Sequence, residues 1–570
     1  MSWAVPLAVA FCGLAAGPAQ LATGAAQDDA PPPAVEQNGV VNAASEMPAQ
    51  FSGGSIARGS LFRVHGWRMG PKETVRPAGF PLPETLSGLA VEIRKGGVVL
   101  HAPVVSVSAT RIEAILPSAA PPGDATLVVV RGGSRGDPFP FRVVPASFGA
   151  FHAPGQRWGQ GLIRNGARDD DGVWNGLTDS AQPGSTVTLL GTGLGAAPGS
   201  DASAPNRVPV ASPNLTITVG GKPVQKIHYT GRSAIAIGVD EITFDVPSGA
   251  PEGCHVPVQV RADAIASNFV SMAIRRGGGA CTDAGDWIRS ASEKARSAGL
   301  IILNHADVWF DLEDSGSTRF RVDSALARFV EDPPVHGSTD RMLSFPPPGT
   351  CTAREHIGHL RGMLTNLSPL DLMEGTPLDA GEQLTFRGAY EMRRIGKSQG
   401  SPNTYGGVLG GNPPVPTANT FPLFLRPGTY GVSGDGPGTG AFEAEVEAWK
   451  PIRWTDRARI ASVDRSRGVT VHWAAARKDS FVLIVAVNAD NGTGALGCAL
   501  CVAPAQPGRF TVPSTVLTNL PPTKPGPGLP FHTLWIIEVP GRAPKPFQGP
   551  RLDRGIAFYV SASGRTVSFR

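Results

Sequence analysis

The stretch GTGLGA carries residue types that can hold the phosphates of a dinucleotide. Gly191, Gly193 and Ala196 match the pattern G-x-G-x-x-G/A, in which glycines follow a strand and open a helix that receives the pyrophosphate. That chemistry needs a helix after the third position and an acidic residue about 20 residues later. Pro198 and Pro205 oppose such a helix, and no Asp or Glu occurs between positions 201 and 240. We therefore expect no nucleotide here, and we expect the glycines to form a turn or bulge after a core strand.

Two cysteine patterns suggest zinc binding or thiol chemistry. Cys351, His356 and His359 supply ligand types that zinc accepts, although no obvious fourth ligand lies nearby. The same histidines spell HIGH, a signature of one class of aminoacyl-tRNA synthetases that works only in a dinucleotide-type fold, and this four-residue match has no other support in the sequence. Cys498 and Cys501 have the C-x-x-C spacing of oxidoreductases, but the prolines that follow oppose the helix N-terminus that lowers a thiol pKa. A structural role is favoured for these cysteines.

The remaining chemical patterns are weak. RDDDGVWN resembles part of a calcium loop through Asp169, Asp171 and Gly172, without the alternating ligands or the distal Glu. The chain contains no G-x-S-x-G, and no grouping of Ser, His and Asp is recognisable from motif context. We therefore assign no catalytic, cofactor-binding or metal-binding residue and expect no cofactor.

Acidic and aromatic residues gather near position 450. Glu443, Glu445 and Glu447 alternate with apolar residues, which is typical of the solvent face of one strand. Aromatic residues in this part of the chain are more often core than a sugar-binding platform. The three tryptophans in question are Trp449, Trp454 and Trp473.

Composition sets the kind of fold that must position these residues. The chain of 570 residues suggests several domains. Gly 71 and Pro 54 accompany a hydrophobic fraction of 41%, which favours short strands over long helices. The formal net charge of +4 is scattered rather than gathered in a basic stripe, so nucleic acid is not an expected partner.

The N-terminus resembles an export signal. Residues 1–27 contain an apolar run and end in small residues, although nothing before Asp28 is charged, so the signal is atypical. A plain N-terminal membrane anchor is the alternative. No other apolar run reaches 18 residues, so no span is expected after signal removal. Residues 28–39 are predicted to be a linker.

An internal repeat organises the first half. Residues 56–70 align with residues 181–195 without a gap, so that Gly66 falls on Gly191 and Gly70 on Gly195. Residues 111–123 align with residues 241–253 in the same way.

Within each copy, apolar residues alternate with polar ones, as in NLTITVG and HVPVQV, which indicates half-buried antiparallel strands. We predict an all-β fold with tandem immunoglobulin-like β-sandwiches at 40–150 and 151–276.

Three segments resemble a known family. GVVNAASEMPAQ with IARGSLFRVHG, DGVWN with PGSTVTLLGTGLG, and VPSGAPEGCHVPVQV with SNFVSMAI look like IPT/TIG immunoglobulin-like domains. They look closer still to an uncharacterised Solibacter-type family of secreted or surface proteins. Arg58 stands where a proline is usual and Arg68 where a glycine is usual. The resemblance implies an immunoglobulin-like fold and export, and it carries no established activity.

The C-terminal half, 282–570, is predicted to be β-rich and to form one or two domains, because short strand-like runs such as EQLTFRG, FVLIVAVN and HTLWIIEV are separated by prolines. LDAGEQLTFRG and CVAPAQPGRFTVPSTVLTNLP resemble segments that follow the sandwich in the same family. One helix is expected at 287–299.

Cys254 and Cys281 are predicted to form a structural disulfide. Cys254 lies two residues before Val256 at the start of one strand, so its side chain is predicted to point to the same, inward face. The next strand, NFVSMAI, returns antiparallel and ends near Cys254, and three glycines then let Cys281 approach. Two unpaired thiols are the alternative. Cys351 with Cys498 or Cys501 is a second candidate pairing.

Together these features predict a secreted or cell-surface β protein that acts as a binding or spacer module for an extracellular polymer or protein. The alternative is a secreted hydrolase whose unrecognised active site lies in residues 282–570.

Overall fold

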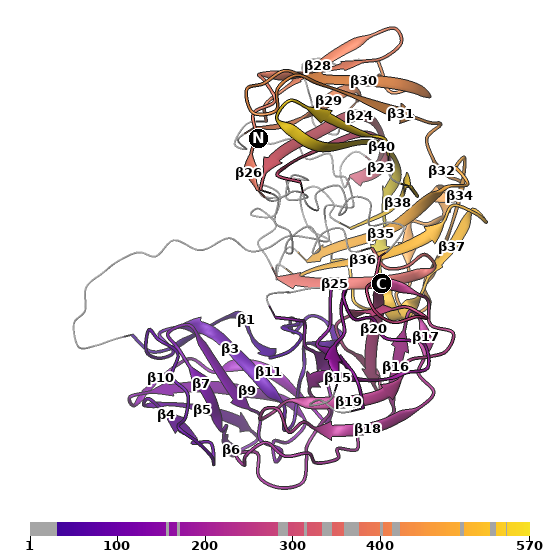
Figure 1. Ribbon diagram of the computed structural model, residues 1–570. Coiled ribbons are helices and arrows are strands. Elements are labelled where there is room, and N and C mark those ends of the chain that lie inside the picture. Colours follow the sequence, from indigo (N-terminus) through magenta and orange to yellow (C-terminus); the bar gives the residue numbers. More distant parts are fainter. Residues whose placement is uncertain are drawn as a thin grey trace. The chain divides into compact units, whose positions relative to one another are not determined.

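The computed structural model describes residues 31–154, 159–167, 172–282, 295–312, 316–332, 345–357, 375–398, 403–412, 422–490, 495–524, 532–542 and 544–570. The regular secondary structure of these residues is almost entirely β-strand, so the fold is all-β, as the composition predicts (Figure 1). The helical elements within these ranges are single turns: α4 (Ser514–Leu517), η2 (Ser52–Gly54) and η4 (Arg457–Arg459). None of the described helices has the length and hydropathy that a membrane span requires.

The chain divides into two compact units. The N-terminal unit ends at Cys281 and also takes in Arg354–His356, and the C-terminal unit comprises Thr282–Ala353 and Ile357–Arg570. The N-terminal unit contains two sandwiches in succession, each with its own apolar core.

Sandwich 1 packs two sheets against each other around side chains such as Phe62, Val64 and Leu127, all fully buried. Its first strand begins at Ala34, so the segment expected to be a linker is already paired with β3 at residues 34 and 35. One sheet has the order β1 (Ala34–Asn42), β3 (Leu61–Trp67), β8 (Arg111–Ile115), β7 (Val104–Val107). The other contains β2 (Ile56–Ala57), β11 (Phe139–Val144), β9 (Gly123–Arg131), β5 (Leu89–Lys95), β4 (Thr85–Leu86), β10 (Ser134–Arg135) and β6 (Val98–His101). All strand pairs in these sheets are antiparallel except the parallel pair of β2 and β11.

Sandwich 2 repeats this plan, and its core contains Ile217, Val219 and Val256, where the alternation in the sequence places them. One sheet contains β14 (Val173–Trp174), β13 (Ile163–Asn165), β15 (Thr186–Thr192), β19 (Asp240–Asp245), β18 (Ile227–Arg232) and β12 (Gly149–Ala150). The other contains β17 (Lys222–Pro223), β16 (Leu215–Val219), β20 (Gly253–Ala262), β21 (Ile265–Ala266) and β22 (Val270–Ile274).

The strand register of the two sandwiches agrees with the sequence repeat. Gly66 is the sixth residue of the seven-residue strand β3, and Gly191 is the sixth residue of the seven-residue strand β15. Leu61 pairs with Ile115 in sandwich 1, and the aligned residue Thr186 pairs with Asp245 in sandwich 2. Both copies therefore have the same antiparallel pairing of two strands, at the same register.

The glycine-rich stretch forms a turn, and its amides bind a carboxylate of the same sandwich. Gly193 has φ +111°, a conformation that favours glycine, and the chain does not continue into a helix. The N–H groups of Gly193 and Leu194 donate to Asp240 Oδ2 at 2.7 and 2.8 Å. The expectation of a turn is correct, and the two amides that the turn leaves free bind the buried Asp240 of the same sandwich.

The sandwiches contact each other through both apolar and polar groups. Leu61 and Ile115 of sandwich 1 lie in one buried cluster with Phe151 and Ile237 of sandwich 2. The backbone N–H of Leu61 donates to Thr192 Oγ1 at 2.9 Å. These contacts fix one sandwich against the other within the N-terminal unit.

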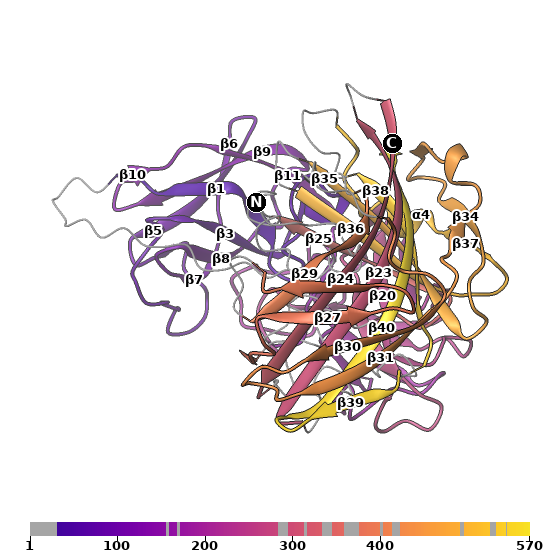
Figure 2. The same ribbon diagram turned by 90° about the horizontal axis from the view of Figure 1, so that it is seen from above.

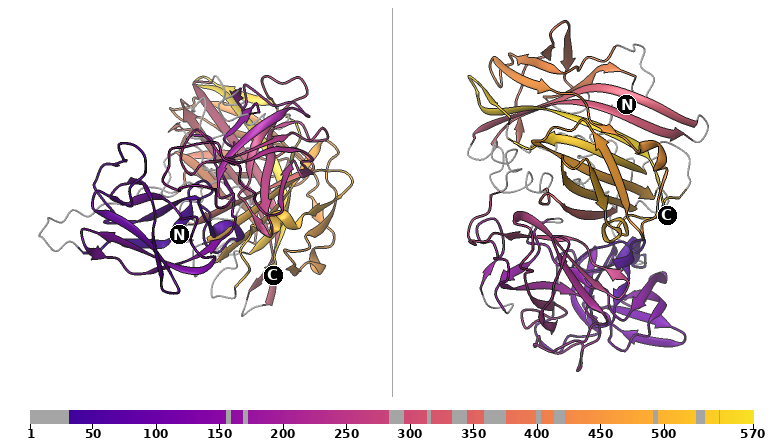
Figure 3. Two further views of the ribbon diagram at one scale, coloured as in Figure 1. Left: turned by 90° about the horizontal axis from the view of Figure 1, so that it is seen from below. Right: turned by 90° about the vertical axis from the view of Figure 1, so that its right-hand side faces the viewer.

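The C-terminal unit is built on a large, mixed sheet, whose long strands lie side by side in the right-hand view of Figure 3. Within the described residues its main path runs β25 (Thr350–Ile357), β36 (Ala495–Pro504), β35 (Ser480–Asp490), β38 (Thr533–Pro540), β40 (Leu552–Thr566), β23 (Ser297–Leu312), β24 (Gly316–Glu331) and β26 (Thr376–Pro377), with β29 (Thr404–Gly411) and β39 (Pro546–Gly549) alongside. Apolar residues of its strands β23, β24 and β40 point alternately into two apolar clusters, one on each face of the sheet.

A four-stranded sheet covers one face of the large sheet across the cluster that contains Phe329, Phe442 and Tyr559. Its order is β28 (Met392–Gly396), β27 (Gln383–Arg387), β30 (Gly428–Gly434), β31 (Phe442–Ala448). Smaller sheets pair β32 (Arg453–Trp454), β34 (Val469–Ala474) and β37 (Arg509–Val512), and β33 (Ser462–Val463) with β41 (Ser568–Phe569).

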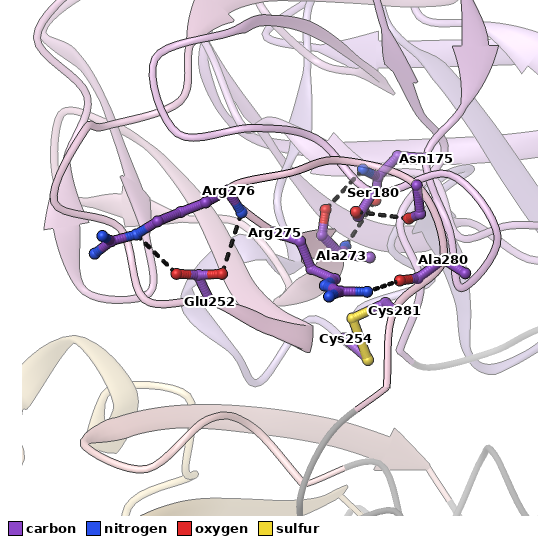
Figure 4. Close-up of a disulfide and its surroundings, with 10 residues drawn as sticks. Asn175, Ser180, Glu252, Cys254, Ala273, Arg275, Arg276, Ala280 and Cys281 are labelled. Carbon is purple, nitrogen blue, oxygen red and sulfur yellow. Dashed lines mark hydrogen bonds and ion pairs between the residues drawn. A yellow bond between two sulfur atoms is a disulfide. The ribbon is translucent and has the colours of Figure 1, made fainter.

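Cys254 and Cys281 are joined, with their Cα atoms 5.5 Å apart (Figure 4). The hairpin brings them together as expected, because Gly253 pairs with Ile274 at the end of β22. The expected inward position of Cys254 is wrong. A register shift between Gly253 and Val256 separates it from the core face, and it packs in a small cluster with Ala273 and Cys281.

Other cysteine patterns have a structural role. Cys351 is bonded to Cys501, one of the two alternatives for that residue. The bond removes Cys351 as a thiolate, so the zinc site with His356 and His359 is excluded. Cys498 and Cys501 lie three residues apart on strand β36, where side chains alternate between faces, so they do not form a C-x-x-C disulfide.

Several expectations fall outside the described residues. They include the signal segment, Asp169, Asp171, His359 and most of the helix expected at 287–299. The last three positions of that helix belong to strand β23, so the helix does not extend there.

Candidate functional site

A cavity of about 410 Å³ lies in the C-terminal unit beside the edge strand β31. Its lining combines one indole, one phenol ring and side chains of both charges. Four separate segments contribute: β30 and β31, the segment before β35, the segment between β38 and β39, and β40. The lining includes Glu445, Glu447, Trp449, Arg477, Asp479, Lys545 and Tyr559.

Trp449 is half-buried, packs against the apolar cluster and lines the cavity. Its ring meets Tyr559 edge to face, with the centroids 4.9 Å apart and the planes at 86°. The guanidinium of Arg477 lies 5.0 Å from the indole centroid, within cation–π distance. The indole Nε1 is buried and has no hydrogen-bond partner among the residues that the structure describes. Trp449 is thus held by its neighbours while part of its surface borders the cavity.

Ion pairs hold the charged lining. Arg477 lies 3.4 Å from Glu447 and 3.2 Å from Asp479, and Lys545 lies 3.4 Å from Glu445. Burial raises the pKa of Asp479, but the hydrogen bond from Arg477 and the charge of Arg477 together outweigh burial, so the pKa lies below its usual value. Asp479 is therefore ionised at neutral pH and accepts hydrogen bonds.

A fully buried glutamate positions the segment that carries Arg477 and Asp479. Glu538 Oε1, on strand β38, accepts the backbone N–H of Arg477 at 2.6 Å and the hydroxyl of Ser480 at 2.7 Å. Its other oxygen accepts the Ser561 hydroxyl at 3.3 Å. Because these bonds satisfy a carboxylate inside the unit, they fix the geometry of the cavity wall above it.

The tertiary structure also brings together Asp323, His305 and Ser561 on neighbouring strands of the large sheet, which no sequence pattern indicates. His305 Nδ1 lies 2.6 Å from Asp323 Oδ1. Ser561 is fully buried, donates to Glu538 and accepts the N–H of Ile452 at 3.1 Å. A nucleophile needs access to substrate, so this row of polar groups is structural.

A second cavity, of about 540 Å³, lies between the two sandwiches of the N-terminal unit and is bordered by Arg232. Its guanidinium forms an ion pair with buried Asp240 and donates to the carbonyls of Gly59 and Gly195 at 2.7 Å each. The donors of Arg232 serve the contact between the sandwiches, so the C-terminal cavity is the better candidate for ligand binding.

Sequence patterns identified the lining of the C-terminal cavity only in part. Glu443, Glu445 and Glu447 are exposed on β31 while the residues between them are buried, which confirms the predicted solvent face. Trp454 and Trp473 are 4% and 5% exposed, which confirms a core position for both. Trp449 differs, because it borders the cavity. No sequence signal identified the contribution of the other four lining residues, Arg477, Asp479, Lys545 and Tyr559.

No protein-family model matches this chain, and no curated protein matches it. Among solved structures, the chain is similar to the extracellular region of plexin A4, at 12% identity over 41% of this chain and 17% of that one, with a TM-score of 0.15. It thus spans about a sixth of that structure.

Two bacterial surface proteins are also similar. One is SGBP-B of the Bacteroides ovatus mixed-linkage glucan utilization locus, in complex with a heptasaccharide, at 10% identity over 78% of this chain and 85% of that one, with a TM-score of 0.14. The other is domains 5–6 of the S-layer protein SbsC, at 13% identity over 42% of this chain and 98% of that one, with a TM-score of 0.15. At such TM-scores none of the three similarities supports a conclusion about function, and the IPT/TIG and Solibacter-type resemblance remains a prediction.

Proposed function

We propose that this protein is an exported, multi-domain β protein that binds carbohydrate in the cavity of its C-terminal unit, with the two sandwiches as a spacer. The observation that carries the proposal is the position of Trp449, held edge-on to Tyr559 beside the cavity and surrounded by carboxylates and a guanidinium. An indole surface packs against the apolar face of a sugar ring, and charged groups exchange hydrogen bonds with its hydroxyls. Ligand sites in proteins typically combine an aromatic surface with a small number of polar groups around it.

Two features support an extracytoplasmic location. The Cys254–Cys281 and Cys351–Cys501 disulfides lie in different units, and such bonds persist in oxidising compartments. The atypical signal at residues 1–27 agrees with export.

Binding without turnover is the form of the proposal that the cavity favours. A carboxylic acid that protonates a leaving group needs a raised pKa. Asp479 has the opposite shift because Arg477 stabilises its charge. If the alternative, a secreted hydrolase with its site in residues 282–570, used this cavity, Glu445 or Glu447 would act as that acid.

The test is to titrate the full chain with a panel of soluble polysaccharides by calorimetry while monitoring new reducing ends. We expect saturable binding that Glu447→Gln or Asp479→Asn weakens about tenfold, because each removes one charged hydrogen-bonding group. Trp449→Ala should abolish binding, with near-UV circular dichroism as the check on folding.

Trp174→Ala is the matched control, since Trp174 is 43% exposed on sandwich 2, and it should leave binding unchanged. New reducing ends would favour the hydrolase. Absence of saturable binding across the panel would contradict the proposal.

A further inference from the structure

One face of the four-stranded sheet in the C-terminal unit separates positive from negative charge. We call it the outer face, and Figure 2 looks onto it. It lies opposite the side that packs on the large sheet, because the alternate residues Phe386, Val432 and Val446 are buried in the core. The outer face consists of Thr385, Arg387, Met392, Arg394, Thr429, Gly431, Ser433, Glu443, Glu445 and Glu447.

Strand register places these residues in rows across the sheet. One row runs from Arg394 through Thr385 and Ser433 to Glu443. The next row runs from Met392 through Arg387 and Gly431 to Glu445. Arginines therefore occupy the β28 side and glutamates the β31 side, with small residues between them.

The two end groups of the first row, Arg394 and Glu443, are exposed. Neither of them forms an ion pair with any described residue. An unpaired guanidinium at one end and an unpaired carboxylate at the other suit a partner with the reverse arrangement.

A projecting aromatic residue and a cavity lie on opposite sides of the same face. Tyr390, in the turn between β27 and β28, is 93% exposed, and Met392 beside it is 46% exposed. Across the sheet, Glu445 and Glu447 border the cavity that contains Trp449. Tyr and Met are residue types that anchor protein interfaces, and anchors bind in pockets.

We propose that the outer face binds the outer face of a second copy of this chain. A two-fold axis parallel to the strands places the β28 side of each copy over the β31 side of the other. Arg394 then lies over the partner's Glu443, twice by symmetry. The turn with Tyr390 then lies over the partner's cavity, since the turn and the cavity are on opposite sides of the face but at the same end of the strands.

The size of the face predicts a weak dimer. Four strands about 4.8 Å apart and about six residues long, at about 3.3 Å per residue, cover roughly 400 Å² per copy. Stable interfaces bury about 800 Å² per partner, so the Tyr390 turn and the cavity must supply the rest. Association should depend on concentration and weaken with salt, because exposed charges are screened. The proposal rests on charge and shape, and not on the identity of the carbohydrate.

Exchange of the charges tests the proposal with the full chain. We expect sedimentation velocity to show self-association of the unmodified protein, and Arg394→Glu alone or Glu443→Arg alone to weaken it at least about tenfold. An equimolar mixture of the two single variants should associate again, because each copy then supplies the charge that the other lacks. The double variant Arg394→Glu/Glu443→Arg should also self-associate. Tyr390→Ala should weaken association without changing its salt dependence.

Rescue by mixing separates a docking surface from a folding defect, since two misfolded variants do not restore each other. Glu73→Arg, at an exposed position on sandwich 1, is the control and should leave association unchanged. A protein that stays monomeric at low salt and high concentration would overturn the proposal. So would a mixture of the two variants that does not associate. Carbohydrate binding by a monomeric chain would leave the proposed function intact while overturning the dimer.

Discussion

Sandwich 1 and sandwich 2 share a backbone register but stabilise it with different chemistry. At one aligned cross-strand position, sandwich 1 has the ion pair of Arg63 with Glu113, 2.9 Å apart. Sandwich 2 has Thr188 and Thr243 there, whose hydroxyls are 3.0 Å apart. A charged pair and a hydroxyl pair thus serve the same strand pairing, because the backbone ladder sets the register and the side chains need only be compatible with it.

The turn after the shared strand differs in the same way. In sandwich 2 the amide of Leu194 binds the buried Asp240 carboxylate, whereas in sandwich 1 the aligned amide of Met69 donates to the carbonyl of Ala109 at 2.9 Å. The residue aligned with Asp240 is the exposed Thr110. The turn therefore depends on a buried charge only in sandwich 2, where it lies against the neighbouring sandwich.

The opposite ends of the two strands also differ. Leu61 and Ile115 end their pairing in an apolar cluster shared with sandwich 2. The aligned residues Thr186 and Asp245 are joined by a hydrogen bond of 2.7 Å and lie at a polar end. A duplicated module thus keeps its strands while its ends adapt to what they contact.

Replacement of the buried carboxylate should show the largest difference. Asp240→Ala leaves Arg232 and two amides without their acceptor, and removal of one partner of a buried pair costs about 3–5 kcal/mol. We expect hydrogen-exchange protection of β15 and β19 to fall accordingly. Thr110→Ala, the aligned change in sandwich 1, should cost less than about 0.5 kcal/mol. Equal losses in both sandwiches would contradict the difference between the two turns.

The disulfide should account for the next largest difference. Replacement of Cys254 and Cys281 by Ser opens a loop with a sequence separation of 27 residues, which the chain-entropy model values at about 3.5 kcal/mol. The residue aligned with Cys254 is Asp124, whose exposed pair with Arg142 should contribute less than about 1 kcal/mol. Denaturant unfolding followed by exchange in β20 and β9 measures both. Peptide mapping without reductant must recover Cys254 joined to Cys281.

At the aligned position of Arg63–Glu113 and Thr188–Thr243, only the pair in sandwich 1 should make stability depend on pH. Burial alone raises the pKa of Glu113, but the charge of Arg63 and hydrogen bonds to Arg63 and Ser106 lower it below the usual value. A carboxyl group whose pKa is lower in the folded than in the unfolded protein stabilises the fold at pH values above its unfolded pKa. This stabilisation is lost as the pH falls through the pKa of the folded state.

Glu113→Gln should therefore cost about 1 kcal/mol at pH 7 and progressively less in acid. Thr243→Val is the aligned change in sandwich 2. It should lower the free energy of unfolding by an amount that stays the same across the pH range in which Glu113 titrates. A Glu113→Gln cost that stays constant from neutral to acidic pH would show that the pair contributes nothing through charge.

The smallest effect is expected at the turn residue Arg68. It has φ +60°, where the aligned Gly193 has +111°. Arg68→Gly relieves a conformation that disfavours side chains but adds freedom to the unfolded chain, so we expect a gain of about 0.5 kcal/mol or less. The aligned Gly193 does not tolerate a side chain in the same way, because a Cβ at this position would lie 2.1 Å from the Ser147 carbonyl oxygen. Thermal unfolding that shows a clear loss for Arg68→Gly would mean that its hydrogen bond to Pro32 outweighs the strain.

Local patterns in the sequence determined the features that depend on neighbouring residues. Alternation of apolar and polar residues predicted the strands, because side chains on a strand point to opposite faces. The repeat predicted the equal positions of Gly66 and Gly191. The hairpin around Cys254 predicted its bond to Cys281, although a single extra residue in the strand reversed its face. The same alternation predicted the exposed glutamates on β31.

Only the tertiary structure decided the sites. The cavity joins Trp449, Arg477, Lys545 and Tyr559 from separate segments, and no spacing in the chain records which strands become neighbours in the large sheet. Asp240 illustrates the physical reason. Its distance along the chain from Gly193 resembles no motif, yet antiparallel pairing of β15 with β19 places its carboxylate against the two amides that the glycine turn leaves free. Sequence determines which residues alternate and turn, and the pairing of distant strands determines which of them meet.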